Sequence, residues 1–206
     1  EVIPKTVDEY YQHRAKFAKQ GAAEQLENPA WHIHSGVPEA GGLPVSFTLL
    51  LNLASVCLAE TPEIVWGYVS NYAPGVSAKS HPELNRMIGY AVNYYQDMVR
   101  PHKTYRLPTA EEAEQIETLA ATIEGLPADA DAEAVQSAVY ATGKDSGYEN
   151  LRDWFLCLYE ILLGQSEGPR MGSFFALYGL AQSVALMRAA LAGELAAGSA
   201  GSGDAA

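Results

Sequence analysis

Apolar residues recur every three or four positions along most of the chain, which is the spacing of one buried face of an α-helix. The pattern is clearest in the segment 153–191, where the first apolar stripe consists of Trp154, Phe155, Leu158, Ile161 and Leu162. Gly164 and Gly179 interrupt the pattern, and we expect each to end a helix, because glycine adopts a left-handed conformation without steric cost. The resulting helices are 153–163, 174–178 and 180–191. Because their links are short, they have to pack on one another, and we predict that they form the closing corner of an all-α domain.

Start signals mark further helices upstream. Thr6 with Glu9, and Thr109 with Glu112, have the three-residue spacing of a capping box, in which a hydroxyl and a carboxylate bind the first backbone N–H groups. Ser173 is expected to cap the short helix 174–178. The predicted upstream helices are 6–20, 46–59, 61–73, 80–99, 109–124 and 132–142. The segment 46–59 is apolar nearly all round, as a central buried helix is.

The expected architecture is an irregular multi-helix bundle of eight or nine helices, because strand signals are almost absent and no internal repeat stands out. Closely spaced Gly and Pro residues predict an irregular segment at 28–44. Residues 1–42 would form a smaller lead-in module, and 43–195 the main helical domain. The small and polar residues of 196–206 predict a flexible tail.

Acidic residues are concentrated in the second half of the chain. Residues 1–107 hold nine Lys and Arg against ten Asp and Glu, a net charge of −1, whereas 108–206 hold four against fifteen, a net charge of −11. The helices 109–124 and 132–142 carry much of this negative charge, and we interpret them as a solvent-facing layer. Because phosphates bind Lys and Arg, a polyanion is expected to contact the first half.

Motifs that carry catalysis or bind cofactors are absent from the sequence, which has no glycine-rich phosphate loop, no nucleophile–histidine motif and no zinc pattern. We therefore predict no catalytic residue, no metal site and no cofactor in this chain. Cys57 and Cys157 lie in apolar helical patterns and are expected to be buried free thiols. Glu1 opens on a charged stretch rather than a signal segment, and the most apolar segment, 47–59, is too short to cross a bilayer. We expect a cytoplasmic protein that does not enter a membrane.

One dense cluster of basic and aromatic residues lies just past a predicted helix end. It consists of Arg100, His102, Lys103, Tyr105 and Arg106. Cations can hold phosphates and an aromatic ring can stack on an unpaired base, so we hypothesise that Lys103 and Arg106 bind RNA phosphates and that Tyr105 stacks on a base. The alternative is a helix C-terminus whose cations interact with the helix dipole.

Two further basic sites are candidates for RNA contacts. Arg170 precedes a predicted helix N-terminus, which offers unpaired N–H groups to an anion, and we expect Arg170 and the 100–106 cluster to border one groove. The first helix carries Arg14, Lys16 and Lys19 in its later turns. These three residues either contact an RNA backbone or form an ordinary solvated face that suits the helix dipole.

Two segments carry a resemblance to a known family. GPRMGSFFALYG, at 168–179, and LPVSFTLLLNLASVC, at 43–57, resemble the C-terminal part of class I lysyl-tRNA synthetases. The resemblance runs from Glu1 to about Leu191 and implies an α-helical cage that binds the tRNA anticodon. The ATP-binding signatures of that family, of the HIGH and KMSKS types, are absent here, and in the family they lie on a nucleotide-binding fold that precedes this part.

The resemblance therefore implies the tRNA-recognising C-terminal portion of a lysine–tRNA ligase. The full-length enzyme would use ATP with magnesium to attach lysine to tRNA, while this portion would bind the anticodon stem-loop and contact the N-terminal catalytic domain. Glu1 is not an initiator methionine, as in a fragment, and we expect the chain alone to be inactive as an enzyme.

Two other classes of function remain open. The acidic helices at 109–142 would suit a stand-alone protein-interaction domain, which would show no salt-sensitive RNA binding. His32, His34 and His81 would suit a small helical enzyme or metal protein, although no Cys or His lies at a recognisable zinc spacing from the first two. Bound metal on elemental analysis would distinguish this last function.

Overall fold

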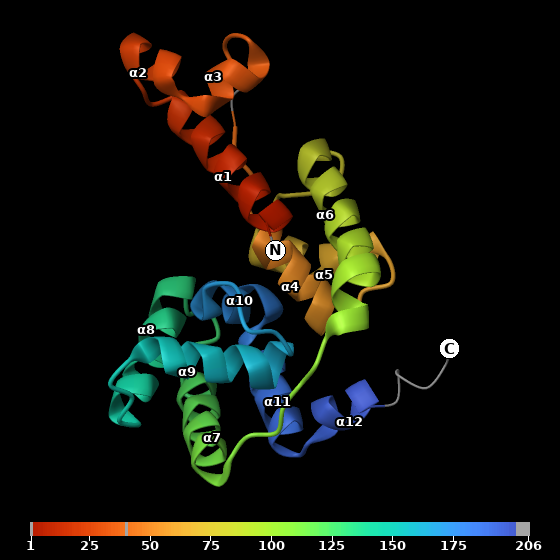
Figure 1. The fold of residues 1–206 in the computed structure, drawn as a ribbon, viewed down its shortest axis with the longest axis vertical. Helices are drawn as coiled ribbons and strands as arrows, with labels where there is room; N and C mark the ends of the chain where they lie inside the picture. The colour runs from red at the N-terminus through yellow and green to blue at the C-terminus, as the bar shows by residue number, and fades with distance from the viewer. Residues whose placement is uncertain (1, 40, 201–206) are drawn as a thin grey trace.

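The computed structural model describes residues 2–39 and 41–200, and these residues form helices and no strand (Figure 1). The expected all-α fold is confirmed, with twelve α-helices in these residues where eight or nine were predicted. They are α1 (Val2–Phe17), α2 (Ala22–Glu27), α3 (Pro29–His34), α4 (Phe47–Val56), α5 (Pro62–Tyr72), α6 (Pro82–Tyr94), α7 (Ala110–Glu124), α8 (Ala132–Asp145), α9 (Leu151–Leu158), α10 (Met171–Tyr178), α11 (Leu180–Leu191) and α12 (Glu194–Ala200). The π-helical turns η1 (Tyr95–Val99) and η3 (Tyr159–Leu163) extend α6 and α9, and a 3₁₀ turn, η2 (Arg100–His102), follows η1.

The helices α1 to α3 form an arm that projects from the rest of the molecule (Figure 1). Its base is fixed to α4, because the Asp8 carboxylate accepts hydrogen bonds from the backbone N–H groups of Phe47 and Thr48 in the first turn of α4. The buried Arg14 guanidinium of α1 also pairs with Glu83 of α6, with Nη1 and Oε1 2.7 Å apart. Charge-assisted hydrogen bonds to two helices therefore hold the orientation of α1.

The hydrophobic core runs without interruption from α4 to α11. Eight of the ten residues of α4 are buried, including Asn52 and Ser55, so the predicted central helix is confirmed. Helices α1, α5, α6 and α10 pack around it. The buried apolar side chains of the arm, Tyr11, Phe17 and Ala30, are not members of this core.

The three helices predicted in the segment 153–191 are present as α9, α10 and α11. Trp154 and Phe174 have no exposed surface, and the Trp154 indole Nε1–H donates to the Val139 carbonyl at 3.0 Å. Gly164 and Gly179 have φ angles of +66° and +99°, which is the left-handed region expected of a glycine that ends a helix. The expectation that the three helices pack mainly on one another was wrong, because α10 packs chiefly on α8, α11 chiefly on α7 and α9 on α8, while α11 also contacts α10 and η3.

Helix α10 approaches α8 very closely at Gly172, whose backbone N–H donates to Gln136 Oε1 at 2.8 Å. Apolar residues of α7 and α8 complete the core beneath it, with Ile116, Leu119, Val135 and Val139 fully buried. The interpretation of these two acidic helices as a solvent-facing layer was therefore incomplete. Each helix exposes its acidic side and buries the other.

Some predicted helix boundaries were wrong. Helix α1 begins at Val2 rather than Thr6, because the Thr6 hydroxyl donates to the Val2 carbonyl within the helix and caps nothing. The segment predicted to be irregular contains α3, which starts where the Asn28 side chain accepts from the Ala30 N–H. Helix α10 begins at Met171, so Ser173 lies inside it. The capping box of Thr109 and Glu112 is confirmed.

The end of the described chain is helical, since α12 reaches Ala200, where a flexible tail was expected from 196. The rest of that predicted tail, 201–206, lies outside the described residues. Within the described ranges, no single helix has both the length and the apolar composition needed to cross a membrane. Helices α10 and α11 have the required length and apolar composition only when they are taken together, and the chain bends by 109° between them.

Candidate functional site

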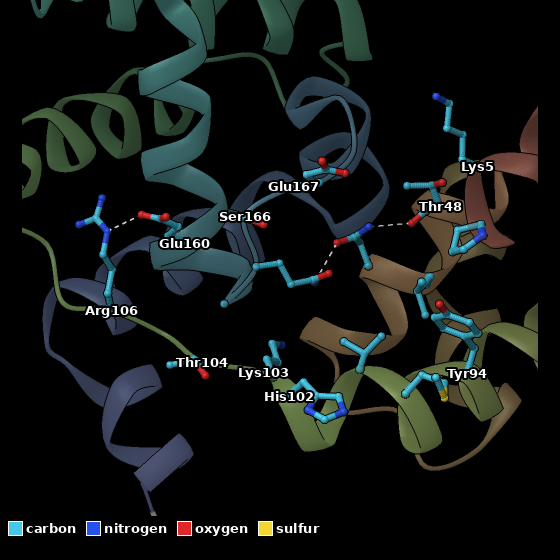
Figure 2. Close-up of a pocket in the computed structure, with 18 residues that line it drawn as sticks. Lys5, Thr48, Tyr94, His102, Lys103, Thr104, Arg106, Glu160, Ser166 and Glu167 are labelled. Atoms are coloured by element: carbon cyan, nitrogen blue, oxygen red, sulfur yellow. Dashed lines mark hydrogen bonds and ion pairs between the residues drawn. The ribbon is translucent and has the colours of Figure 1, made fainter. Parts of the chain in front are cut away.

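A cavity of about 720 Å³ opens between the base of the arm, α4, the end of α6 and the loop that follows η3 (Figure 2). Figure 2 shows Lys5 and Thr48 on one side of it, Arg106 and Glu160 on the opposite side, and Lys103 between them. Its wall also includes Leu51, Asn52, Tyr94, Met98, Val99, His102, Thr104 and residues 164–168. Segments from both halves of the chain therefore build the site.

Both π-helical turns border this cavity. Met98 and Val99 come from η1, and Glu160 comes from η3, while Gly164 follows directly after η3. A π-turn has a wider hydrogen-bond ring than the α-helix that it extends, and such turns occur frequently at functional sites. The two turns thus direct the ends of α6 and α9 into the cavity wall.

Two side-chain amides join α4 to the loop across the cavity. The Asn52 amide donates to the Thr48 carbonyl at 2.8 Å, and Gln165 Nε2 lies 3.4 Å from Asn52 Oδ1 (Figure 2). Amide groups can both donate and accept hydrogen bonds, which makes them suited to recognising the edge of a nucleobase. Asn52 was not predicted as a site residue. The only indication in the sequence was that a polar side chain interrupts a largely apolar helix.

Lys103 does not project into solvent as a phosphate-binding lysine would. Its ammonium Nζ donates to the Ser55 carbonyl at the end of α4, at 3.0 Å, and lies 4.7 Å from the centre of the Tyr105 ring. Burial lowers the pKa of Lys103 to about 7, and burial also raises the pKa of Tyr105. Tyr105 therefore packs under Lys103, and its ring is not freely presented for stacking on a base.

Arg106 is held by two carboxylates. Its Nε donates to Glu160 Oε2 at 2.6 Å, and its two Nη groups donate to the Glu112 carboxylate at 2.7 Å each. These hydrogen bonds lower the pKa of Glu112 to about 2. The neighbouring Arg100 and His102 are exposed, and His102 lies on the wall of the cavity. Of the predicted cluster, these two remain open to solvent.

Arg170 pairs with Glu133 at 2.7 Å, and both side chains are largely exposed. It borders a second, smaller hollow of about 350 Å³, next to Pro169 and Ser173. Thr48 lines both hollows, so Arg170 and the 100–106 cluster border neighbouring depressions rather than a single cavity.

The three candidates on the first helix differ from one another. Arg14 is buried and paired with Glu83, whereas Lys16 and Lys19 are exposed, and neither has an ion-pair partner among the described residues. Lys5 lies on the same helix at the cavity and was not predicted. It lies eleven residues before Lys16, which places the two on the same face of α1, about 16 Å apart along its axis.

Two of the three histidines considered as metal ligands have other contacts, and His32 is exposed. His34 Nε2 lies 2.8 Å from the Tyr10 hydroxyl, and His81 Nδ1 lies 2.9 Å from the Ser80 hydroxyl. In the part of the chain that the structure describes, no group of three His, Cys, Asp or Glu side chains could hold a metal ion. Cys57 and Cys157 are free thiols, as predicted, although Cys57 is only partly buried.

Fold and site together define an all-α domain with a cavity that is lined by both apolar and polar side chains and that has exposed basic residues beside it. No known family's sequence profile matches this chain. It is, however, 46% identical over 195 residues to a lysine–tRNA ligase of Roseobacter denitrificans, covering 95% of this chain and 37% of that protein. Lysine–tRNA ligases of Rickettsia bellii and Rickettsia felis are each 39% identical, over 91% and 93% of this chain and 36% and 37% of their own length.

Over nearly all of its length, the chain is thus homologous to a portion of proteins named lysine–tRNA ligase. It spans just over a third of the length of these relatives.

Proposed function

We propose that this chain is the anticodon-binding portion of a class I lysine–tRNA ligase. The observation that carries the proposal is the similarity to lysine–tRNA ligases over 91–95% of the chain. The parent enzyme uses ATP with magnesium to attach lysine to tRNA on a separate N-terminal catalytic domain. This portion binds the anticodon stem-loop and makes no bond itself.

The physical basis of such recognition is that anticodon bases are unpaired and can enter pockets between helix ends. The cavity offers one such pocket, where the Asn52 and Gln165 amides face the space that a base edge would occupy. Of the two amides, Gln165 is better placed to hydrogen-bond a base edge, because Asn52 is buried and already donates to the Thr48 carbonyl.

We expect the phosphates to be bound by basic residues that have no carboxylate partner. Arg14, Arg106 and Arg170 are each bound to a glutamate, so releasing them for a phosphate costs an existing ion pair. The exposed basic residues of α1 and of the cavity's surroundings are better placed. They are Lys5, Lys16 and Lys19 on or beside α1, and Arg100 and His102 next to the cavity.

The test is a titration of an anticodon stem-loop at several salt concentrations. Lys16→Ala and Arg100→Ala should weaken binding to all RNAs and should each reduce the slope of log affinity against log salt by about 0.7–1, because each removes one phosphate contact. Gln165→Ala should instead reduce the preference for the cognate loop over one with altered anticodon bases.

Lys144→Ala is the matched control, since Lys144 is an exposed lysine on α8 in the acidic half. Its salt slope should equal that of the parent chain. Binding that does not depend on salt in any of these proteins would contradict RNA recognition and would favour a protein-interaction domain. A separate assay, lysine-dependent exchange of pyrophosphate into ATP, should give no signal with the purified chain.

A further inference from the structure

Among the described residues, hydrogen bonds join the arm to the helices of the core at two places. The first is the Asp8 carboxylate, which binds the first turn of α4 and stands next to Val7, the one apolar side chain of the arm that packs against the core. The second is Glu83, in the first turn of α6. Its Oε1 accepts from Arg14 Nη1 at 2.7 Å and from the Tyr11 hydroxyl at 3.0 Å.

The contact at Glu83 neutralises a buried cation. The Arg14 side chain is only 4% exposed, and its other partners are the Glu39 carbonyl and the rings of Tyr10 and Tyr11. Among the described residues, Glu83 is the only carboxylate within ion-pairing distance of Arg14. A buried charge that loses its partner is costly, because nothing replaces the water that burial removed. Loss of the Glu83 charge therefore favours any movement that returns Arg14 to water.

The arm can make such a movement without disturbing the core. Its own buried apolar residues include Phe17 and Ala30, which are not members of the core, and the Phe17 ring stacks on Trp31 with the ring centres 6.2 Å apart. The arm continues into residues 35–46, whose described part forms no helix and can follow a change of direction. The arm can therefore turn as a unit about the Asp8 contact.

The cavity lies on the opposite side of this contact from Glu83. Pro4 and Lys5 of α1 line the cavity (Figure 2). Along α1, Lys5 lies three residues before Asp8 and Arg14 lies six residues after it, which corresponds to about 4.5 Å and about 9 Å along the axis. When a rigid helix turns about Asp8, its two ends move in opposite directions. A displacement of about 3 Å at Arg14, enough to admit a water molecule, becomes about 1.5 Å at Lys5 and about 4.5 Å at Phe17.

We infer that Glu83 is a positioning residue for the cavity and that α1 is the lever through which it acts. Glu83 holds Arg14, Arg14 fixes the tilt of α1, and this tilt sets where Lys5 lies in the cavity wall. Glu83 does not itself line the cavity, so its effect reaches the site only through α1. Whatever moves the far end of the arm changes the cavity wall in the same way.

The experiment compares Glu83→Ala with Glu63→Ala. Both glutamates directly follow a proline in the first turn of a helix, so both variants lose the same favourable charge at a helix N-terminus. Glu63 is a matched control, because it forms no ion pair with the arm among the described residues. Glu83→Gln is the milder variant, since it keeps an acceptor for the Tyr11 hydroxyl and removes only the charge.

The orientation of the arm is measured as a distance between two nitroxide labels by double electron–electron resonance. The labels are attached to Glu27→Cys, on α2, and to Ser137→Cys, on α8, both of which are exposed positions. Cys57→Ala removes the partly exposed native thiol, and Cys157 is buried. In Glu83→Ala, the mean distance should change by about 4 Å or more.

The cavity wall is followed in the same variants by the ¹³C-methyl signals of the methionines. Met98 lines the cavity, whereas Met171 and Met187 are fully buried in the core and serve as references. In Glu83→Ala the Met98 signal should shift and the two reference signals should not. Glu83→Gln should shift the distance and the Met98 signal in the same direction by a smaller amount, and Glu63→Ala should match the parent chain in both measurements.

Three results would overturn the inference. An unchanged distance in Glu83→Ala would show that Glu83 does not hold the arm. A changed distance with an unchanged Met98 signal would refute the lever. Shifts of Met171 and Met187 as large as that of Met98 would show a change of the whole fold instead. If Glu83→Ala does not fold, Glu83→Gln decides by the same measurements. No RNA is present in either measurement, so the outcome is independent of the tRNA-binding experiments.

Discussion

Gly172→Ala is the substitution for which the fold makes the sharpest prediction. A Cβ at this position would lie 2.6 Å from the backbone nitrogen of Gln136 and would also press on the Ala132 carbonyl. Both obstacles are backbone atoms of α8, so no side-chain rotation can relieve the clash. The two helices would have to separate, which would lengthen the hydrogen bond from the Gly172 N–H to Gln136 Oε1.

The magnitude follows from opposing effects. Alanine is favoured over glycine inside a helix by about 1 kcal/mol. Overpacking a closely packed contact costs about 1–3 kcal/mol, occasionally more, and weakening a buried hydrogen bond adds about 1 kcal/mol. We therefore expect a net loss of about 2 kcal/mol in the free energy of unfolding, which corresponds to a fall in Tm of about 4–8 °C for a chain of this length.

The assay is urea and thermal unfolding followed by circular dichroism, with Gly67→Ala and Gly89→Ala as matched controls. Both controls lie inside helices, α5 and α6, and a Cβ at either position would meet nothing within 4 Å. Each should stabilise the protein by about 0.5–1 kcal/mol. If Gly172→Ala were as stable as the controls, the close approach of α10 to α8 would be refuted.

Three further predictions concern the core and two charged groups. Trp154→Ala and Phe174→Ala should each cost about 3–5 kcal/mol in the free energy of unfolding, and unchanged thermal midpoints for both would contradict the packing of the closing corner. The pKa of Glu112 is lowered to about 2, so its contribution to stability is complete above about pH 4.3 and is lost as the pH falls towards 2. Glu112→Gln should therefore flatten the acid dependence of the urea midpoint in that window. The slope for Lys103 has the same sign but lies at higher pH, because from its folded pKa of about 7 up to the ordinary value of about 10.4 the unfolded chain binds more protons and stability rises with pH. Lys103→Met should remove that rise.

The sequence predicted which segments are helical better than it predicted where each helix begins. Thr109 and Thr6 have the same spacing to a following glutamate, but only Thr109 is a cap. A hydroxyl inside a helix can donate to the carbonyl four residues earlier, as Thr6 does to Val2, so the motif alone cannot distinguish a start from an interior turn. Propensity and capping patterns carry no information on how far upstream a helix continues.

The site was predicted less well, because some partners of its charged and polar groups are distant in the sequence. The density of cations at 100–106 was visible, but Arg106 is bound to Glu160, 54 residues away. The burial of Lys103 depends on Gly164 and on the end of α4, which only the packed fold brings together. Local sequence can indicate which groups are present, whereas burial and pairing decide which of them remain reactive or free.

The motif that carries the resemblance turns out to be a packing motif. A Cβ at Gly168 would lie 2.7 Å from an atom of the Tyr159 ring, Gly172 touches α8, and Gly179 has a positive φ angle. Three glycines at fixed spacing therefore satisfy three separate steric requirements. This explains why the segment is recognisable in the sequence although only Arg170 within it was a candidate for binding.

The division of charge along the chain gives the molecule an electric dipole. The near-neutral first half forms the arm and α4 to α6, while the second half, residues 108–206 with a net charge of −11, contains α7 to α12 (Figure 1). A polyanion that approaches is repelled by the acidic end, and the resulting torque turns the arm and the cavity towards it before contact. Salt screens this field beyond about 8 Å at physiological ionic strength. Added salt should therefore slow the arrival of a polyanion more than it hastens its departure.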